Sequence, residues 1–129
     1  MFRRLFLAGS LAVLAAPAIS GEAEHKAGTI QLTAAQIDTL LSGNTIKGTW
    51  NDAPYTQYYN ENGVTLYVPE GGQPDEGKWR VKEDTDQYDS WWQSTGWTPY
   101  TVVMTNDGYA WVNGASMEPF KVVSGNALP

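Results

Sequence analysis

Acidic side chains are the groups of this sequence whose types and spacing come closest to those of a catalytic site. Asp52 with Glu61, or Asp86 with Asp89, could serve as the general acid and base that cleave a glycosidic bond. The single histidine, His25, precedes the predicted folded domain, cysteine is absent, and no serine stands in a nucleophile elbow. Since surface acids are expected in so anionic a chain, we predict no catalytic residue and keep a carboxylate-dependent glycan hydrolase as the second alternative.

An acidic turn is the one candidate for a metal site. Glu83, Asp84, Asp86 and Asp89 could offer oxygen ligands to calcium, but their spacing does not fit an EF-hand loop. A hydrated acidic hairpin loop is the simpler interpretation. We therefore predict neither a metal nor a cofactor.

Aromatic side chains are the stronger candidates for a site, because the chain holds six Trp and seven Tyr, more than so small a core is expected to bury. Flat ring faces near Asn, Gln and Asp groups suit sugars, peptides or a protein partner. The predicted binding residues lie on or near a Trp-rich hairpin: Tyr67, Trp91, Trp92, Trp97 and Tyr100. Trp91 and Trp92 are neighbours on a predicted strand and cannot both face inward, so one must face out, enter a pocket or sit at a bulge.

A short helix and a series of strands must position these rings. Thr33 and Gln36 form a capping box, Leu32 can pack on Ile37, and Gly43 can end the helix in a left-handed turn. From Thr45 onward the apolar period changes to two, and turn residues recur about every ten positions. The predicted strands are Thr45–Trp50, Tyr55–Asn60, Val64–Val68, Lys78–Lys82, Tyr88–Gln93, Thr98–Thr105, Tyr109–Val112 and Phe120–Val123.

This pattern predicts a mainly β fold, a small antiparallel barrel or sandwich of about eight short strands with one short N-terminal helix. Alternation along the strands also predicts core residues. They are Val64, Leu66 and Val68 on one face, Trp79 with Val81 on another, and Tyr109 with Trp111.

The N-terminal residues predict export. Arg3 and Arg4 precede a short apolar run, and small residues around Ala18 fit a signal-peptidase site, which gives a signal peptide over 1–20, a flexible leader over 21–29 and a single β-rich domain over 30–129. The expected destination is the periplasm or medium of a bacterium, by the general secretory route or, alternatively, the twin-arginine route. Without residues 1–20 the chain has six basic and fourteen acidic residues, a net charge of −8. We therefore expect neither nucleic-acid binding nor a membrane anchor after cleavage.

Two copies of Gly-x-Trp, Gly48 to Trp50 and Gly77 to Trp79, recur along the predicted strands. A glycine allows close backbone approach, and the Trp two positions later can close one end of a small barrel, so we interpret both Trp residues as structural. The first copy follows a short helix, which is similar to the start of the lipocalins and their calycin relatives. The shortness of the strands argues against the deep pocket of avidin-like proteins.

A longer resemblance extends from Leu32 to the C-terminus. A helix of the form Leu-Thr-x-x-x-Ile, the two Gly-x-Trp strands, a Trp-rich hairpin and a terminal Phe120, Val122, Gly125 and Asn126 pattern resemble a family of small exported bacterial proteins of unknown function. The resemblance implies two cysteines flanking the hairpin. The corresponding neighbourhoods here are Asp89 and Pro99, so this chain lacks that bridge.

These observations together favour a non-enzymatic periplasmic binding or interaction domain whose aromatic site lies on the Trp-rich hairpin. The expected partner is an unknown envelope protein or a cell-wall glycan. An accessory or inhibitor protein that docks on an envelope enzyme is the alternative, because the acidic loops Pro69–Glu76 and Glu83–Asp89 could steer onto a basic partner.

Overall fold

A computed structural model describes residues 29–129 of the chain. The predicted signal peptide over 1–20 and nearly all of the predicted leader over 21–29 lie outside the described residues. The described elements in chain order are β2 (Ile30–Gln31), α1 (Ala34–Leu41), β3 (Thr45–Trp50), β4 (Ala53–Tyr59), β5 (Val64–Pro69), β6 (Asp75–Lys82), β7 (Gln87–Trp92), β8 (Gly96–Thr105), β9 (Gly108–Asn113) and β10 (Ser116–Val123).

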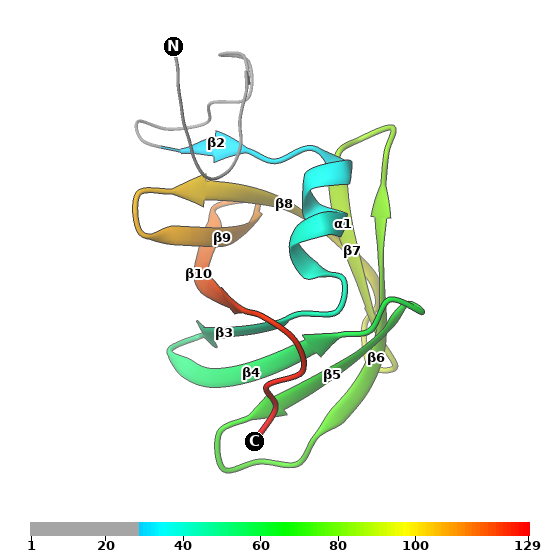
Figure 1. Cartoon of the computed structure of the whole chain (residues 1–129), viewed down its shortest axis with the longest axis vertical. Coiled ribbons are helices and arrows are strands. Elements are labelled where there is room, and N and C mark those ends of the chain that lie inside the picture. Colours follow the sequence, from blue (N-terminus) through cyan, green and yellow to red (C-terminus); the bar gives the residue numbers. More distant parts are fainter. Residues whose placement is uncertain (1–28) are drawn as a thin grey trace.

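The strands β3 to β10 form a closed antiparallel barrel (Figure 1). Each strand pairs with the next along the chain, and β10 returns to β3, where Val122 lies opposite Ile46. The short β2 lies outside this ring on β8, with Ile30 opposite Met104. The predicted mainly β fold is confirmed, and it is a barrel because the last barrel strand pairs with the first.

The helix α1 covers one end of the barrel (Figure 1). Its first turn has the predicted capping box, since Thr33 accepts a bond from the Gln36 amide and the Gln36 side chain accepts one from the Thr33 amide. Ile37 and Leu41 project into the barrel core and are fully buried. Within residues 29–129 no helix is both long and apolar enough to cross a membrane.

The turn between β6 and β7 fastens α1 to the barrel. The Asp86 carboxylate accepts a hydrogen bond of 2.8 Å from the backbone amide of Ala34, the first residue of the helix. A carboxylate at this position also interacts favourably with the positive end of the helix dipole. One member of the predicted acidic turn is therefore a helix-capping group.

The core prediction holds for β6 and β9 and is wrong for β5. Trp79 and Trp111 are buried in the core, with Val81 and Tyr109 packed against them. On β5 the residues that face the interior are Thr65 and Tyr67, so the outer face carries Val64, Leu66 and Val68, which are only partly buried. Thr65 faces the interior because its hydroxyl pairs with a buried glutamine, and Tyr67 does so because its ring stacks on a tyrosine of β4.

The glycine of each Gly-x-Trp copy makes room for a neighbour. A Cβ at Gly48 would lie 2.8 Å from the carbonyl oxygen of Pro119. A Cβ at Gly77 would collide with the backbone carbonyl oxygen of Trp91 and lie 2.6 Å from two ring carbons of Trp92. Gly77 therefore lets the Trp92 ring lie directly across the backbone of β6 inside the barrel.

Candidate functional site

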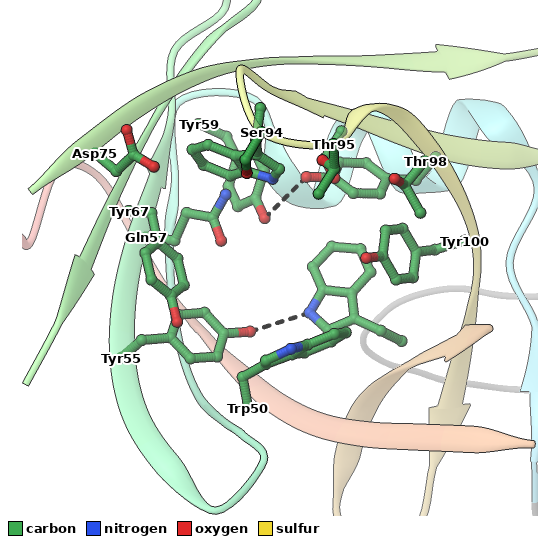
Figure 2. A pocket seen from close by; sticks show the side chains of 14 residues that line it. Trp50, Tyr55, Gln57, Tyr59, Tyr67, Asp75, Ser94, Thr95, Thr98 and Tyr100 are labelled. Atoms are coloured by element: carbon green, nitrogen blue, oxygen red, sulfur yellow. Dashed lines mark hydrogen bonds between the residues drawn. The ribbon is translucent and has the colours of Figure 1, made fainter.

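The barrel encloses a pocket at the end opposite α1. The helix is held by the turn between β6 and β7, whereas Ser94 and Thr95 at the pocket mouth belong to the turn at the other end of β7. The cavity has a volume of about 340 Å³, which lies within the range of small-molecule sites. It is lined by Trp50, Tyr55, Gln57, Tyr59, Tyr67, Asp75, Tyr88, Ser90, Trp92, Ser94, Thr95, Thr98, Tyr100 and Trp111 (Figure 2).

Aromatic rings from five strands form the side walls of this pocket. Tyr55 and Tyr67 stack with their ring centres 4.9 Å apart, and the Tyr67 ring meets the edge of Trp92 at 5.9 Å. On the other side Trp50 and Tyr100 pack edge to face at 6.0 Å. These ring-on-ring contacts stabilise the packing of the walls.

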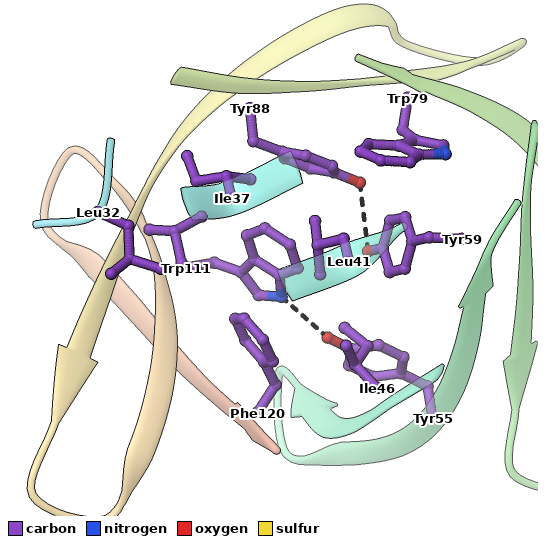
Figure 3. Packing of buried hydrophobic residues seen from close by; sticks show 11 residues of the cluster. Leu32, Ile37, Leu41, Ile46, Tyr55, Tyr59, Trp79, Tyr88, Trp111 and Phe120 are labelled. Atoms are coloured by element: carbon purple, nitrogen blue, oxygen red, sulfur yellow. Dashed lines mark hydrogen bonds between the residues drawn. The ribbon is translucent and has the colours of Figure 1, made fainter. Parts of the chain in front are cut away.

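The floor of the pocket consists of Tyr59, Tyr88 and Trp111, which also belong to the core beneath α1 (Figure 3). The Tyr88 hydroxyl donates to the Tyr59 hydroxyl at 3.2 Å. The Trp111 indole N–H donates to the Tyr55 hydroxyl at 3.1 Å. These bonds satisfy polar groups that burial would otherwise leave unpaired, so the floor is a fixed part of the core.

Every phenol that lines the pocket is held in its neutral form. Burial removes water from the phenolate and raises the pKa above the ordinary value of 10 for Tyr55, Tyr59, Tyr67, Tyr88 and Tyr100. The shift is greatest for the three most buried rings, those of Tyr55, Tyr59 and Tyr88. At neutral pH the pocket therefore presents phenol groups that donate and accept hydrogen bonds and carry no charge.

The structure divides the five predicted binding residues between the two faces of the barrel wall. Tyr67, Trp92 and Tyr100 face inward and line the pocket. Trp91 and Trp97 face outward and lie opposite one another on β7 and β8. The neighbouring residues Trp91 and Trp92 thus point to opposite sides of the strand, as the alternation requires.

The two outward tryptophans each carry a cation from β6. The Arg80 guanidinium lies 3.9 Å from the ring centre of Trp97, and the Lys78 ammonium lies 4.8 Å from that of Trp91. Arg80 also donates to the Asp89 carboxylate at 3.0 Å. Trp97 remains 40% exposed, so this outer cluster is a surface feature separate from the pocket.

Several pocket residues were not among the predicted binding residues. Trp50, which the Gly-x-Trp motif predicts to be structural, packs against the core and also lines the pocket. Gln57 and Asp75 line the pocket and are not among the predicted binding residues. The signal for Gln57 was present, because its alternation with Tyr55 and Tyr59 places all three on one face of β4. What the alternation could not indicate is that this face encloses a cavity.

The carboxylate pairs considered for acid–base chemistry do not meet. Asp52 and Glu61 lie in the turns at opposite ends of β4. Asp86 bonds a helix amide, and Asp89 pairs with an arginine on the outer face. In the described part of the chain, the one carboxylate that lines the pocket is that of Asp75. Among residues 29–129 no group of three or more acidic, histidine or cysteine side chains is arranged to hold a metal ion.

Comparison of the chain with protein-family models, with curated proteins and with solved structures returned no match.

Proposed function

We propose that this protein is a non-enzymatic binding domain, exported to the bacterial periplasm or medium, that holds a small molecule in its barrel cavity. The observation that carries the proposal is the cavity itself, about 340 Å³ in volume and walled by aromatic rings from several strands. Concave sites of this size with mainly aromatic walls and a few polar groups are typical of ligand pockets.

The chemistry of the lining favours binding over catalysis. Eight of its residues are Trp or Tyr, and its phenols are neutral. Within residues 29–129 the lining includes one carboxylate and no histidine, lysine or arginine. A lone carboxylate at the mouth lacks the second acid or base that hydrolysis of a glycosidic bond requires. The same lining suits a flat ligand that stacks on rings, and a cell-wall glycan remains among the candidates.

The test compares pocket variants with a matched variant on the outer face. Neutral ring compounds and cell-wall oligosaccharides are screened by thermal unfolding, where a ligand at about 100 times its Kd raises the unfolding free energy by about 2.7 kcal/mol. We expect a ligand whose stabilising effect is lost in Tyr67→Ala and Trp92→Ala and kept in Trp97→Ala. A site inside the barrel would be contradicted if the stabilising effect of the ligand is lost equally in all three variants, or if it is lost only in Trp97→Ala.

A second candidate, an accessory or inhibitor protein that docks on an envelope enzyme, is favoured by the outer cluster. Trp97 is 40% exposed, with Trp91 beside it and the Arg80 guanidinium on its ring. Exposed Trp and Arg side chains are frequent anchors of protein interfaces. In this case Trp97→Ala weakens retention of an envelope enzyme by the immobilised protein and Tyr67→Ala leaves it unchanged. If Tyr67→Ala weakens retention and Trp97→Ala leaves it unchanged, the result would instead support the cavity as the site.

A further inference from the structure

The side chain of Gln57 presents a hydrogen-bond acceptor without a donor inside the cavity. Its amide nitrogen donates to the Thr65 hydroxyl at 2.8 Å, and that hydroxyl donates its one proton to the Tyr58 carbonyl at 2.9 Å. Thr65 can therefore only accept from Gln57, which fixes which end of the amide carries the oxygen. Within residues 29–129 no group donates to the Gln57 side-chain oxygen.

This acceptor is deeply buried and belongs to the pocket wall. Gln57 is 5% exposed, and Figure 2 shows its amide projecting from β4 into the ring of aromatic side chains. A buried carbonyl without a donor is unfavourable and is rare in folded proteins. A ligand that brings an N–H or O–H group to this wall removes that deficit.

Asp75 continues the same wall toward the mouth. Gln57 lies opposite Tyr67, and Tyr67 lies opposite Asp75, so the three side chains form one row across β4, β5 and β6 on the inner face. Asp75 is exposed, and in the described part of the chain no protein group forms a salt bridge or hydrogen bond with its carboxylate. The row therefore consists of two free acceptors, one of them charged, on either side of a tyrosine ring.

The surrounding charges favour a cation in this position. Among the described residues, no lysine, arginine or histidine lines the pocket. The two cations nearest in sequence, Lys78 and Arg80, lie on the outer face of β6, where each is held over a tryptophan ring. An anion brought beside Asp75 would lose hydration without gaining a partner, whereas a cation gains both the carboxylate and the faces of the rings.

The cavity also limits the size of the ligand. Its volume of about 340 Å³ is roughly twice that of a cavity of about 150 Å³ that holds benzene. One ring, or two fused rings, with a short arm fills such a space. The walls of Trp50, Trp92 and Tyr100 are suited to the faces of such a body.

We propose that the cavity binds a protonated primary amine carried on a flat apolar body, with the ammonium on the wall of Gln57, Tyr67 and Asp75. The inference rests on the proposed function, since it names the class of ligand for the same cavity. The N–H groups of the ammonium supply the missing donor to Gln57, and its charge faces the Asp75 carboxylate. A neutral sugar could supply the donor but would gain no charge attraction from the exposed Asp75 carboxylate.

Three probes that share a phenylethyl body and differ in the end group test the charge requirement: 2-phenylethylamine, 2-phenylethanol and 3-phenylpropionate. Binding is measured at neutral pH from tryptophan fluorescence, excited where phenyl groups do not absorb. We expect the amine to bind about tenfold more tightly than the alcohol, and the carboxylate to bind most weakly. Asp75→Asn should remove the preference for the amine and keep the affinity for the alcohol. Glu76→Gln, which removes the same charge on the outer face of β6, should leave the preference unchanged.

The outcomes separate this inference from the proposed function. If the amine and alcohol bind equally well, or if Asp75→Asn keeps the preference for the amine, the cavity binds ligands and the proposed ligand class is wrong. If none of the three probes binds, and Tyr67→Ala changes the binding of no screened ring compound or oligosaccharide, both the inference and the proposed function fail. Loss of the preference in Glu76→Gln would also overturn the inference, because net charge and not the pocket wall would then account for it.

Discussion

Alkaline pH should unfold this barrel through its buried tyrosines. Tyr55, Tyr59 and Tyr88 have pKa values raised above 10 by burial, while the same phenols in the unfolded chain ionise near 10. Below pH 10 both states keep the phenols protonated, and these groups do not make the unfolding free energy depend on pH. Above pH 10 only the unfolded state releases protons, so the stability is lost as the pH rises toward the pKa values of the folded state.

The magnitude follows from the number of phenols. One proton released only on unfolding lowers the unfolding free energy by about 1.4 kcal/mol per pH unit, and three lower it by about 4 kcal/mol per pH unit. A domain with a stability of about 5–8 kcal/mol is then unfolded roughly one to two pH units above 10. The loss should be cooperative, because the three rings form the floor and wall of one pocket.

The assay is urea denaturation at several pH values between about 9 and 11.5, followed by far-ultraviolet circular dichroism and by phenolate absorbance. In the folded protein the buried phenols should stay protonated, so the phenolate absorbance should reach its full value only when the circular dichroism signal of the β-strands is lost. Tyr59→Phe removes one of the three protons, so the slope should fall to about 2.7 kcal/mol per pH unit. If all seven tyrosines ionise near pH 10 while the circular dichroism signal of the β-strands persists, the conclusion that three of them are buried in the pocket floor and wall is wrong.

Two substitutions test how the barrel is held together. Gly77→Ala places a Cβ against the Trp91 carbonyl oxygen and 2.6 Å from the Trp92 ring, so we expect a cost of about 1–3 kcal/mol, a shifted tryptophan emission and weakened binding of pocket ligands. An unchanged emission spectrum would mean that the ring does not lie on this glycine. Asp86→Ala removes the acceptor for the Ala34 amide and should lower stability by about 0.5–2 kcal/mol in urea denaturation, whereas Asp84→Ala, in the same turn, should cost less than about 0.5 kcal/mol. Equal effects of the two variants would show that the bond to the helix contributes nothing.

The architecture could be predicted from the sequence because local signals agree along this chain. Apolar alternation and turn residues such as Gly63 and Gly108 mark all eight barrel strands, and the capping box at Thr33 marks the helix. The choice between barrel and sandwich could not be made in this way. It depends on the pairing of Ile46 with Val122, residues from the two ends of the domain, and no local pattern records that pairing.

The candidate site could be predicted only in part, because alternation identifies the two faces of a strand without indicating which one is inside. On β5 the more apolar face, with Leu66, looks outward, and the interior takes Thr65 because a hydroxyl is needed beside Gln57. On β7 the same ambiguity placed Trp91 and Trp92 in one predicted site, although the barrel wall separates them. In this barrel, polar partners and ring contacts determine which side chains of a strand point inward more than hydrophobicity does.

The pairing of β3 with β10 also has a consequence for how the chain folds. Until these two strands meet, the growing sheet has two open edges, and each can recruit a strand from another molecule. Because the pairing joins distant parts of the sequence, it is a slow step for a protein of this size. In the finished barrel these two edges pair with each other and are no longer open to strands of other molecules. The danger of aggregation is therefore confined to the interval before Ile46 and Val122 come together.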